Sequence, residues 1–324
     1  DLYRHIQERG LKLWIDCPDP GWGSLIGNAL DRGCGYTMPQ YRNHWEARCG
    51  MEVVLPNGDL VRTGMGAVEG SATWQEYRNG YGPIVDGLFT QSNLGIVTKM
   101  GFWLMPQPEG YRTGTIEVAK FEDLHALVRI LNDVENSRLF NGMPYLSSPL
   151  LNVSNMPEAL GMETPDRPLA NPSAEHLRLI AGAKAGYSPQ LEQFGLDNGI
   201  AYWALRLGFY GPEKVTAAQW EAVKHKFSAI EGARFHEGKR ITLPLAEAER
   251  EAVHLAELGI PSLEIFQLIV RRSFNPAGSR GHIGFSPIIP RTGQAIIDLN
   301  RHLGPLLSAA RTGWSGGFIL PHLY

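Results

Sequence analysis

Cysteine is scarce in this chain, with only three among 324 residues. Cys17, Cys34 and Cys49 are odd in number and contain no Cys-x-x-Cys spacing, which argues against a disulfide framework and against a zinc site. We therefore expect buried, reduced thiols. A large charge of one sign is also absent. The formal net charge is -3, so the sequence predicts no electrostatic surface for nucleic acid or for an anionic membrane.

Long apolar runs are missing as well. No run approaches the roughly 20 residues of a membrane-spanning helix, and no signal peptide opens the chain. The composition, 43% hydrophobic and 19% charged, is that of an ordinary globular protein, and the length is sufficient for two domains. We therefore expect a cytoplasmic protein that binds neither nucleic acid nor membrane.

An initiating methionine is absent too, because the chain begins with Asp1. Residues 1–10 already show the apolar spacing of an amphipathic helix, and the chain stops at Tyr324 in a stretch with the composition of folded structure. We therefore expect a fragment that lacks segments at both ends.

Glycine, in contrast, is plentiful, and the segment from Asp16 to Tyr36 concentrates it. Five glycines, two prolines and three carboxylates occupy its 21 positions, which is too much glycine for a helix or a strand interior. Glycine at this density lets a backbone turn sharply or come close to a flat or anionic group. From the residues alone, a loop-rich connection between two layers of a large domain is the simpler interpretation.

The pattern of this segment continues into further runs downstream. In chain order, the runs are Asp16-Cys17-Pro18-Asp19, Gly21, Gly23, Ser24, Gly27, Asn28, Arg32-Gly33-Cys34-Gly35-Tyr36-Thr37, GMEVVL at 50–55, RTGMG at 62–66, DGLFTQSN at 86–93, GIVTK at 95–99 and WLMP at 103–106. They resemble the flavin-binding region of the vanillyl-alcohol oxidase and 4-cresol dehydrogenase family. The resemblance is dense up to Pro106, sparser beyond it, and returns near His282.

Pro106-Gln107-Pro108 is the clearest domain boundary in the sequence. Strand-like and loop-like stretches precede it, with a hairpin predicted at Asn57-Gly58. Strands and helices alternate after it, as in a ferredoxin-like layer. We predict an α+β protein. By resemblance, residues 1–106 form the C-terminal part of an FAD-binding domain of the p-cresol methylhydroxylase (PCMH) type, and residues 107–324 form a truncated ferredoxin-like α+β cap domain for the substrate.

Hydrophobic periodicity places the elements of the second domain. We predict strands at 113–118, 202–210 and 282–289 and helices at 121–132, 213–230 and 293–309, with a surface excursion at 156–189.

Asp19 lies between two prolines, and from the residues alone a surface turn explains it. The resemblance implies a different role, because vanillyl-alcohol oxidase-like members have an aspartate here beside the reactive N5 of the flavin. Such a carboxylate stabilises positive charge on the oxidised substrate or acts as a base. Members similar to 4-cresol dehydrogenase have a small polar residue instead, so Asp19 indicates the oxidase-like branch.

His282 begins an apolar, strand-like run, where a histidine is commonly structural. By resemblance, it is the residue bonded covalently to the 8α-methyl group of FAD, since a neutral imidazole is a competent nucleophile. The tyrosine that 4-cresol dehydrogenases use has Ile269 as its nearest counterpart, which cannot form this bond. Gly284 replaces a family aromatic, and if it lines the substrate cavity it leaves room for a bulkier ring substituent.

Further cofactor contacts follow from the same resemblance. Main-chain groups of glycines and of two neighbouring residues are expected to face the pyrophosphate and ring carbonyls, and polar side chains are expected to add hydrogen bonds. The residues concerned are Ser24, Gly27, Asn28, Gly33, Gly35, Tyr36, Asn93, Gly95, Ile96 and Val97. Each of them is also compatible with an ordinary turn or core position. His44, His225, His236 and His254 share no metal-ligand spacing, so we expect no metal.

The resemblance implies an FAD-dependent enzyme that oxidises para-substituted phenols of the vanillyl-alcohol, 4-alkylphenol or eugenol type. A hydride would pass from the benzylic carbon to flavin N5, giving a p-quinone methide. Dioxygen or a cytochrome would accept the electrons, and a homo-oligomer is expected. Three alternatives stay open: a cytochrome-coupled, hydroxylating 4-cresol dehydrogenase-like flavoprotein, a non-catalytic fragment of such an enzyme, and a flavoenzyme for sugars or lactones.

Overall fold

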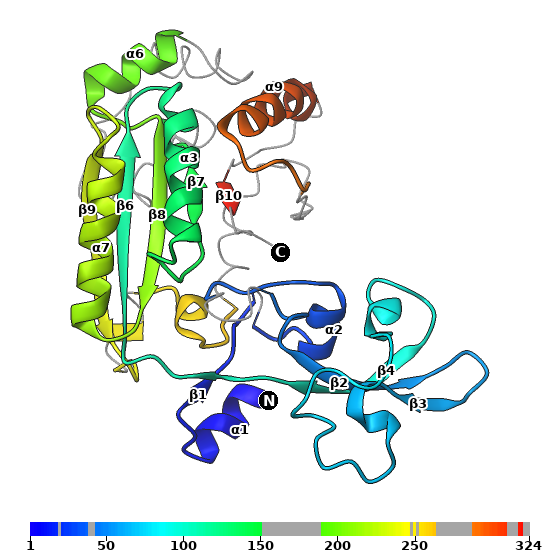
Figure 1. Cartoon of the computed structure of the whole chain (residues 1–324). Helices are drawn as coiled ribbons and strands as arrows, with labels where there is room; N and C mark the ends of the chain where they lie inside the picture. Colours follow the sequence, from blue (N-terminus) through cyan, green and yellow to red (C-terminus); the bar gives the residue numbers. More distant parts are fainter. Residues whose placement is uncertain are drawn as a thin grey trace. The chain divides into compact units, whose positions relative to one another are not determined.

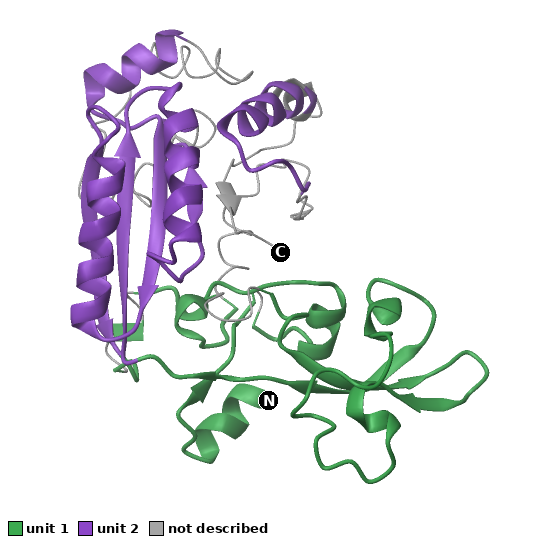
Figure 2. Cartoon of the chain, viewed as in Figure 1, with its two compact units in different colours: residues 1–108, 243–266, 322–324 green, residues 109–242, 267–321 purple. Residues whose placement is uncertain are grey.

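The computed structural model of the chain describes residues 1–18, 21–37, 43–150, 189–246, 249–250, 253–263, 287–309 and 317–319. They form two compact units (Figure 2). The first unit comprises residues 1–108 with the described part of 243–266, and the second comprises residues 109–242 with the described part of 267–321. The functional division predicted from the sequence, 1–106 and 107–324, stays a prediction, because a unit of packing is not yet a unit of function.

The first unit is built on a three-stranded antiparallel sheet. Its order is β3 (Leu60–Arg62), β2 (Arg48–Val54) and β4 (Ile96–Phe102). The turn between β2 and β3 is the predicted hairpin, in which Gly58 has a φ of +89° and its N–H donates to Leu55 O at 2.9 Å. Of the Asn57-Gly58 pair only Gly58 has positive φ, which glycine adopts without steric cost, whereas Asn57 Oδ1 accepts a hydrogen bond from Asp59 N at 3.1 Å. The hairpin prediction is confirmed.

Apolar residues of β2 form the core of the first unit. Met51 and Val53 are fully buried and pack with Trp45 and Phe89. A second small sheet pairs β1 (Leu13–Trp14) with β5 (Met105–Pro106). The helix expected at the start of the chain is α1 (Leu2–Glu8), followed by Gly10 at a φ of +62°. The remaining short elements are α2 (Leu25–Leu30), η1 (Gly64–Ala67), η2 (Asp86–Phe89) and η5 (Leu255–Leu258).

The described part of the second unit contains a five-stranded antiparallel sheet and four helices (Figure 1). In sheet order, the strands are β10 (Gly317–Ile319), β7 (Tyr145–Ser147), β8 (Trp203–Tyr210), β6 (Gly110–Val118) and β9 (Arg234–Thr242). The helices are α3 (Asp123–Asn136), α6 (Pro189–Asn198), α7 (Glu213–Phe227) and α9 (Gly293–Ala309). The chain order β6-α3-β7-β8-α7-β9 and the sheet order β7-β8-β6-β9 are those of a ferredoxin-like layer. The α+β prediction is confirmed.

The core of the second unit lies between the sheet and the helices. Trp220 of α7 is fully buried and packs so closely on β6 that a Cβ at Gly114 would lie 2.5 Å from its ring. Leu127 of α3 and Leu205 of β8 are also fully buried in this cluster. Glycine at position 114 thus lets the large indole ring lie directly against the strand.

The predicted helices at 121–132, 213–230 and 293–309 correspond to α3, α7 and α9, and two predicted strands correspond to β6 and β8. The third predicted strand, 282–289, lies largely outside the described residues, and its described part, 287–289, is not in a strand. Residues 156–188 of the predicted surface excursion also lie outside them. Among the helices that the structure describes, none has both the length and the apolar character needed to cross a membrane.

Candidate functional site

Asp16 is the polar centre of the glycine-rich segment. Its carboxylate accepts hydrogen bonds from Gly35 N at 2.6 Å, from Thr37 N at 2.9 Å and from Thr37 Oγ1 at 2.7 Å. Burial alone would raise the pKa of Asp16, but the hydrogen bonds and charge of His44, together with the donors of Thr37, hold this pKa below its ordinary value. Asp16 is therefore an ionised carboxylate around which the segment folds.

His44 completes this centre. Its side chain is 2% exposed, and its Nε2 lies 3.1 Å from Asp16 Oδ2. Nδ1 of the same ring is hydrogen-bonded to Asn28 Oδ1. The sequence suggested only that His44 belongs to no metal site, and no local pattern marks it, because its partners are 28 and 16 positions away along the chain.

Gly33 and Gly35 are glycines because this polar centre leaves no space for a side chain. A Cβ at Gly33 would lie 2.5 Å from Asn28 Oδ1, and a Cβ at Gly35 would overlap the Asp16 carboxylate. Their N–H groups were expected to face a cofactor. Instead, Gly33 N donates to Asn28 O at 2.9 Å, and Gly35 N donates to Asp16. Acceptors within the segment thus already use both donors, and the cofactor-binding roles of Gly33 and Gly35 stay predictions.

Ser24 and Gly27 form the start of α2. Ser24 Oγ accepts from Gly27 N at 3.0 Å, which makes Ser24 the N-cap of the helix. The serine hydroxyl keeps its own O–H, which is able to donate to another group. Asn28, one turn further along α2, directs its amide oxygen to His44. Ser24 therefore still fits the donor role expected from the sequence, whereas the oxygen of Asn28 is used inside the segment.

Gly95, Ile96 and Val97 lie at the start of β4. Within the described sheet, β4 pairs only with β2, through Ile96 opposite Val54 and Val97 opposite Val53. Main-chain groups on the other side of β4 are thus available to a ligand. Ile96 is 71% exposed, and Asn93, in the preceding loop, is exposed as well.

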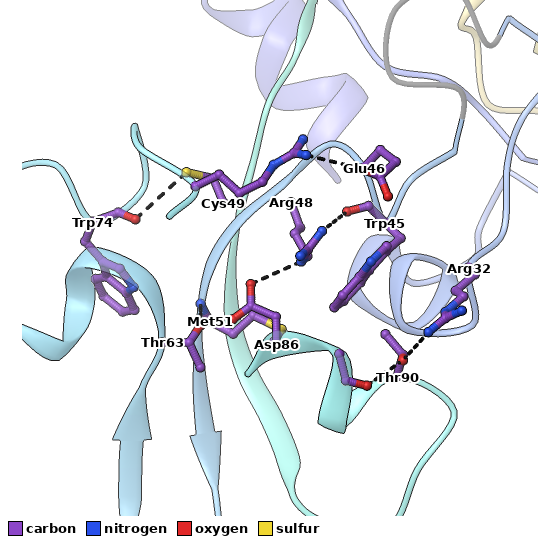
Figure 3. Close-up of polar contacts among 12 residues, drawn as sticks. Arg32, Trp45, Glu46, Arg48, Cys49, Met51, Thr63, Trp74, Asp86 and Thr90 are labelled. Carbon is purple, nitrogen blue, oxygen red and sulfur yellow. Dashed lines mark hydrogen bonds and ion pairs between the residues drawn. The ribbon is translucent and has the colours of Figure 1, made fainter. Parts of the chain in front are cut away.

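Contacts between residues 30–32 and 90–91 connect the glycine-rich segment to the region before β4. Gln91 N donates to Leu30 O at 3.1 Å, and Arg32 Nη2 donates to Thr90 Oγ1 at 3.2 Å (Figure 3). Arg32 and Gln91 both have positive φ, 57° and 47°, which is uncommon for residues with side chains and is typical of functional sites. The two groups of predicted cofactor residues are therefore held in one unit.

A buried ion pair joins β2 to η2, the short helix that precedes residues 90–91. Arg48 Nε of β2 lies 3.1 Å from Asp86 Oδ2, and the two side chains are 7% and 2% exposed. The guanidinium group also lies 3.6 Å from the centroid of the Trp45 ring, and its Nη1 donates to Trp45 O (Figure 3). Burial lowers the pKa of Arg48, and the Asp86 carboxylate opposes that shift. Asp86 begins η2, so the pair fixes η2 to the sheet.

Residues 253–263 lie against the glycine-rich segment, although they follow the last strand of the ferredoxin-like layer in the chain. Tyr36 meets His254 edge to face, with ring centroids 4.8 Å apart. Gly21 N donates to Ser262 O at 2.8 Å, and a Cβ at Gly21 would lie 2.7 Å from Pro261 Cα. These contacts were not predicted, because no periodicity links positions more than 200 residues apart.

Three predicted site residues, Asp19, His282 and Gly284, lie outside the described residues. Their proposed roles therefore stay predictions. In the part of the chain that the structure describes, no three His, Cys, Asp or Glu side chains gather in a way that could hold a metal ion.

The described donors fit the chemistry of FAD. Of the neighbouring residues Ile96 and Val97, one directs its N–H and C=O away from β2, and a donor and an acceptor placed side by side suit the polar rim of a flavin ring. The Ser24 hydroxyl and the exposed Asn93 amide add side-chain donors suited to a polar chain or a phosphate.

Comparison with known proteins points the same way. Residues 1–64 match the family model of the FAD binding domain. The chain is 35% identical over 292 residues to the 4-cresol dehydrogenase [hydroxylating] flavoprotein subunit of Pseudomonas putida, covering 89% of this chain and 50% of that protein. It is 37% identical over 155 residues to 1'-carboxy-chondrochloren decarboxylase of Chondromyces crocatus, covering 47% of this chain and 27% of that protein.

Solved structures extend the likeness over both units. p-Cresol methylhydroxylase with substrate bound matches with a TM-score of 0.72 and 30% identity, over 99% of this chain and 57% of that chain. 4-Ethylphenol oxidase from Gulosibacter chungangensis, in its isoeugenol complex, matches with a TM-score of 0.73 and 27% identity over the same shares. The chain thus spans about half the length of its first relatives. By its sequence and its fold, it belongs to the vanillyl-alcohol oxidase and p-cresol methylhydroxylase family of flavoproteins.

Proposed function

We propose that this protein is an FAD-dependent oxidoreductase that oxidises para-substituted phenols. The observation that carries the proposal is the 35% identity with a 4-cresol dehydrogenase flavoprotein subunit across 89% of the chain. The donor set around Ser24 and the open edge of β4 support it, because both suit a flavin. FAD, when bound, supplies the acceptor for the hydride that leaves the benzylic carbon of the phenol.

The residues that we propose for the chemistry are Asp19 and His282. Asp19 would stabilise the positive charge that develops on the oxidised substrate, and would hold or accept a proton as the product forms. From a 4-alkylphenol, loss of a proton after the hydride has left would give an alkenylphenol, and addition of water would give a benzylic alcohol. From a benzylic alcohol such as vanillyl alcohol, loss of the hydroxyl proton after the hydride has left would give the aldehyde or ketone. Gly284 would leave space for a bulky substituent on the ring.

We propose His282 as the covalent attachment point of FAD. The flavin should then stay on the polypeptide after acid precipitation and remain visible by its fluorescence on a denaturing gel. His282→Ala should release it, whereas His225→Ala, at an exposed position of α7, should not. Flavin that leaves the unaltered protein on denaturation would rule out the covalent bond while leaving a bound, dissociable cofactor possible.

Two candidate functions, an oxidase and a cytochrome-coupled dehydrogenase, differ in their electron acceptor. Asp19 and His282 favour an oxidase that uses dioxygen, whereas the identity with a hydroxylating 4-cresol dehydrogenase subunit favours a cytochrome partner. Measuring oxygen consumption against reduction of cytochrome c, over a panel of 4-alkylphenols and vanillyl-type alcohols, distinguishes them. We also propose that the protein acts as a homo-oligomer in the cytoplasm. If no flavin binds, the chain is a non-catalytic part of such an enzyme.

A further inference from the structure

His44 is a buried imidazole that has no part in the function proposed above. It precedes β2 and is 2% exposed. Its ring meets three other parts of the first unit: Nε2 lies 3.1 Å from Asp16 Oδ2, Nδ1 is hydrogen-bonded to Asn28 Oδ1, and its ring lies edge-on to Phe102 of β4 at 6.1 Å between centroids. Packing alone does not explain this placement, because both polar atoms of the ring meet oxygen atoms.

The main chain at His44 adds a fourth connection. His44 N donates to Gly33 O at 2.9 Å. Gly33 and Gly35 both lie so close to their polar neighbours that neither tolerates a Cβ. Asp16, in turn, holds Gly35 N and Thr37 N. The shape of residues 33–37 therefore depends on Asp16 and Asn28, and His44 joins these two side chains to each other.

We propose that His44 is the positioning residue of the flavin site. It acts through Asp16 and Asn28, and it fixes the glycine-rich segment next to β4, whose open edge carries Ile96 and Val97. This assignment to a flavin site rests on the proposed function, but the positioning of the segment itself does not. A ring without polar atoms would fill the same space, yet it would remove one donor from the Asp16 carboxylate and would leave Asn28 Oδ1 without its partner.

The test compares His44→Phe with His44→Gln in the full chain. Phenylalanine keeps the ring volume and loses both the hydrogen bond to Asn28 and the polar contact with Asp16, whereas the glutamine amide can still donate to Asp16. Amide hydrogen exchange, resolved to peptides that contain Gly35 and Thr37, should become at least tenfold faster in His44→Phe than in the unaltered chain. In His44→Gln the exchange rate should lie close to that of the unaltered chain. Exchange in β2 should stay unchanged. His225→Phe, at an exposed histidine of the second unit, is the control.

A variant of Asp16 tests the same contact without changing His44. Asp16→Asn alters the same contact from the other side, so its effect on exchange should not add to that of His44→Phe in the double variant. If His44→Phe does not fold, amide exchange of the same peptides in His44→Gln and Asp16→Asn tests whether this contact positions residues 33–37. Equal exchange at Gly35 and Thr37 in the folded variants and the unaltered chain would overturn the proposal.

The bound flavin gives a readout that a purely structural role would not change. The visible circular dichroism band of the flavin, normalised per flavin bound, should weaken in His44→Phe and recover in His44→Gln. An unchanged band beside a lowered melting temperature would mean that His44 only stabilises the fold, which contradicts the proposal. An unaltered chain that binds no flavin would count against the proposed function, and the exchange comparison would still decide whether His44 positions the segment.

Discussion

The Asp16 carboxylate has four donors within hydrogen-bond distance, from Gly35, from Thr37 twice and from His44. A carboxylate with this many partners replaces the hydration that it loses on burial. Glycine at position 35 follows from it, since Gly35 must come close enough to donate its N–H and a Cβ there would overlap the carboxylate. At the scale of single residues, this internal anion therefore explains one of the glycines of the segment without any ligand.

Because Asp16 is ionised in the folded protein, we predict that the free energy of unfolding falls in acid. Because the pKa of Asp16 is lowered in the folded protein, its contribution to the free energy of unfolding is complete above the unfolded value, about 3.9, and is lost as the pH falls through the lower folded value. The unaltered chain should therefore lose stability below about pH 4 more steeply than Asp16→Asn, in urea unfolding followed at several pH values. Parallel curves for the two proteins would contradict the assignment.

Cys34 offers a second prediction at this scale. Burial, and then the negative charge of Asp16, raise the pKa of the Cys34 thiol to about 12. At pH 8, the folded protein should therefore react with iodoacetamide at Cys34 about 10³ times more slowly than the urea-unfolded protein, because only the thiolate reacts. Mass spectrometry of the peptide containing Cys34 measures this ratio. Cys34 is partly buried in the structure, and labelling at the same rate with and without urea would show that its thiol is neither shielded from solvent nor close to Asp16.

At the scale of elements, η2 is joined to β2 by the buried pair of Asp86 and Arg48. Sequence reasoning identified the run 86–93 only through its resemblance to a family. In the structure, Asp86 forms a buried ion pair with Arg48 of β2. Thr90 and Gln91, further along the same run, contact residues 30–32. This run therefore connects the sheet to the glycine-rich segment.

Asp86→Ala should be strongly destabilising, because it leaves the Arg48 charge buried without its partner. The expected loss is about 3–5 kcal/mol. Glu46→Ala is the matched control, since it breaks the more solvent-accessible Arg78–Glu46 pair, with side chains 34% and 45% exposed, and should cost about 0–1 kcal/mol. Chemical denaturation of both variants gives the comparison. Equal losses would mean that burial of the Arg48–Asp86 pair has no energetic consequence.

Periodicity predicted the elements with a clear apolar face and missed those without one. α3 and α7 carry regularly spaced buried side chains, so their positions were predicted with errors of a few residues at their ends. β8 was located by its alternating large apolar residues, although the structure buries seven of its eight side chains and therefore both of its faces. β9 was missed because its sequence, RFHEGKRIT, is mostly charged or polar and exposed. It is an edge strand in the described sheet, where charged residues prevent unwanted pairing. Its place in the sheet depends on β6, which local sequence does not reveal.

At the scale of the whole molecule, the family and the α+β class could be predicted because long ordered runs and alternating elements are properties of the sequence. The candidate site was predicted only in part. Asn28, Gly33 and Gly35 do lie together, but their centre, Asp16 with His44, depends on long-range packing. The same holds for the contacts of Gly21 and Tyr36 with residues 253–263. Such contacts have no local signature in one sequence, so the internal use of the glycine N–H groups could not be foreseen.

The central claim is that this protein transfers a hydride from a para-substituted phenol to a bound flavin. It is tested most directly by adding 4-ethylphenol to the flavin-loaded protein without oxygen and recording the flavin absorption. The account predicts that the visible band bleaches to that of reduced flavin. A preparation that binds no flavin, or one whose band is bleached by dithionite but by no para-substituted phenol, would contradict it.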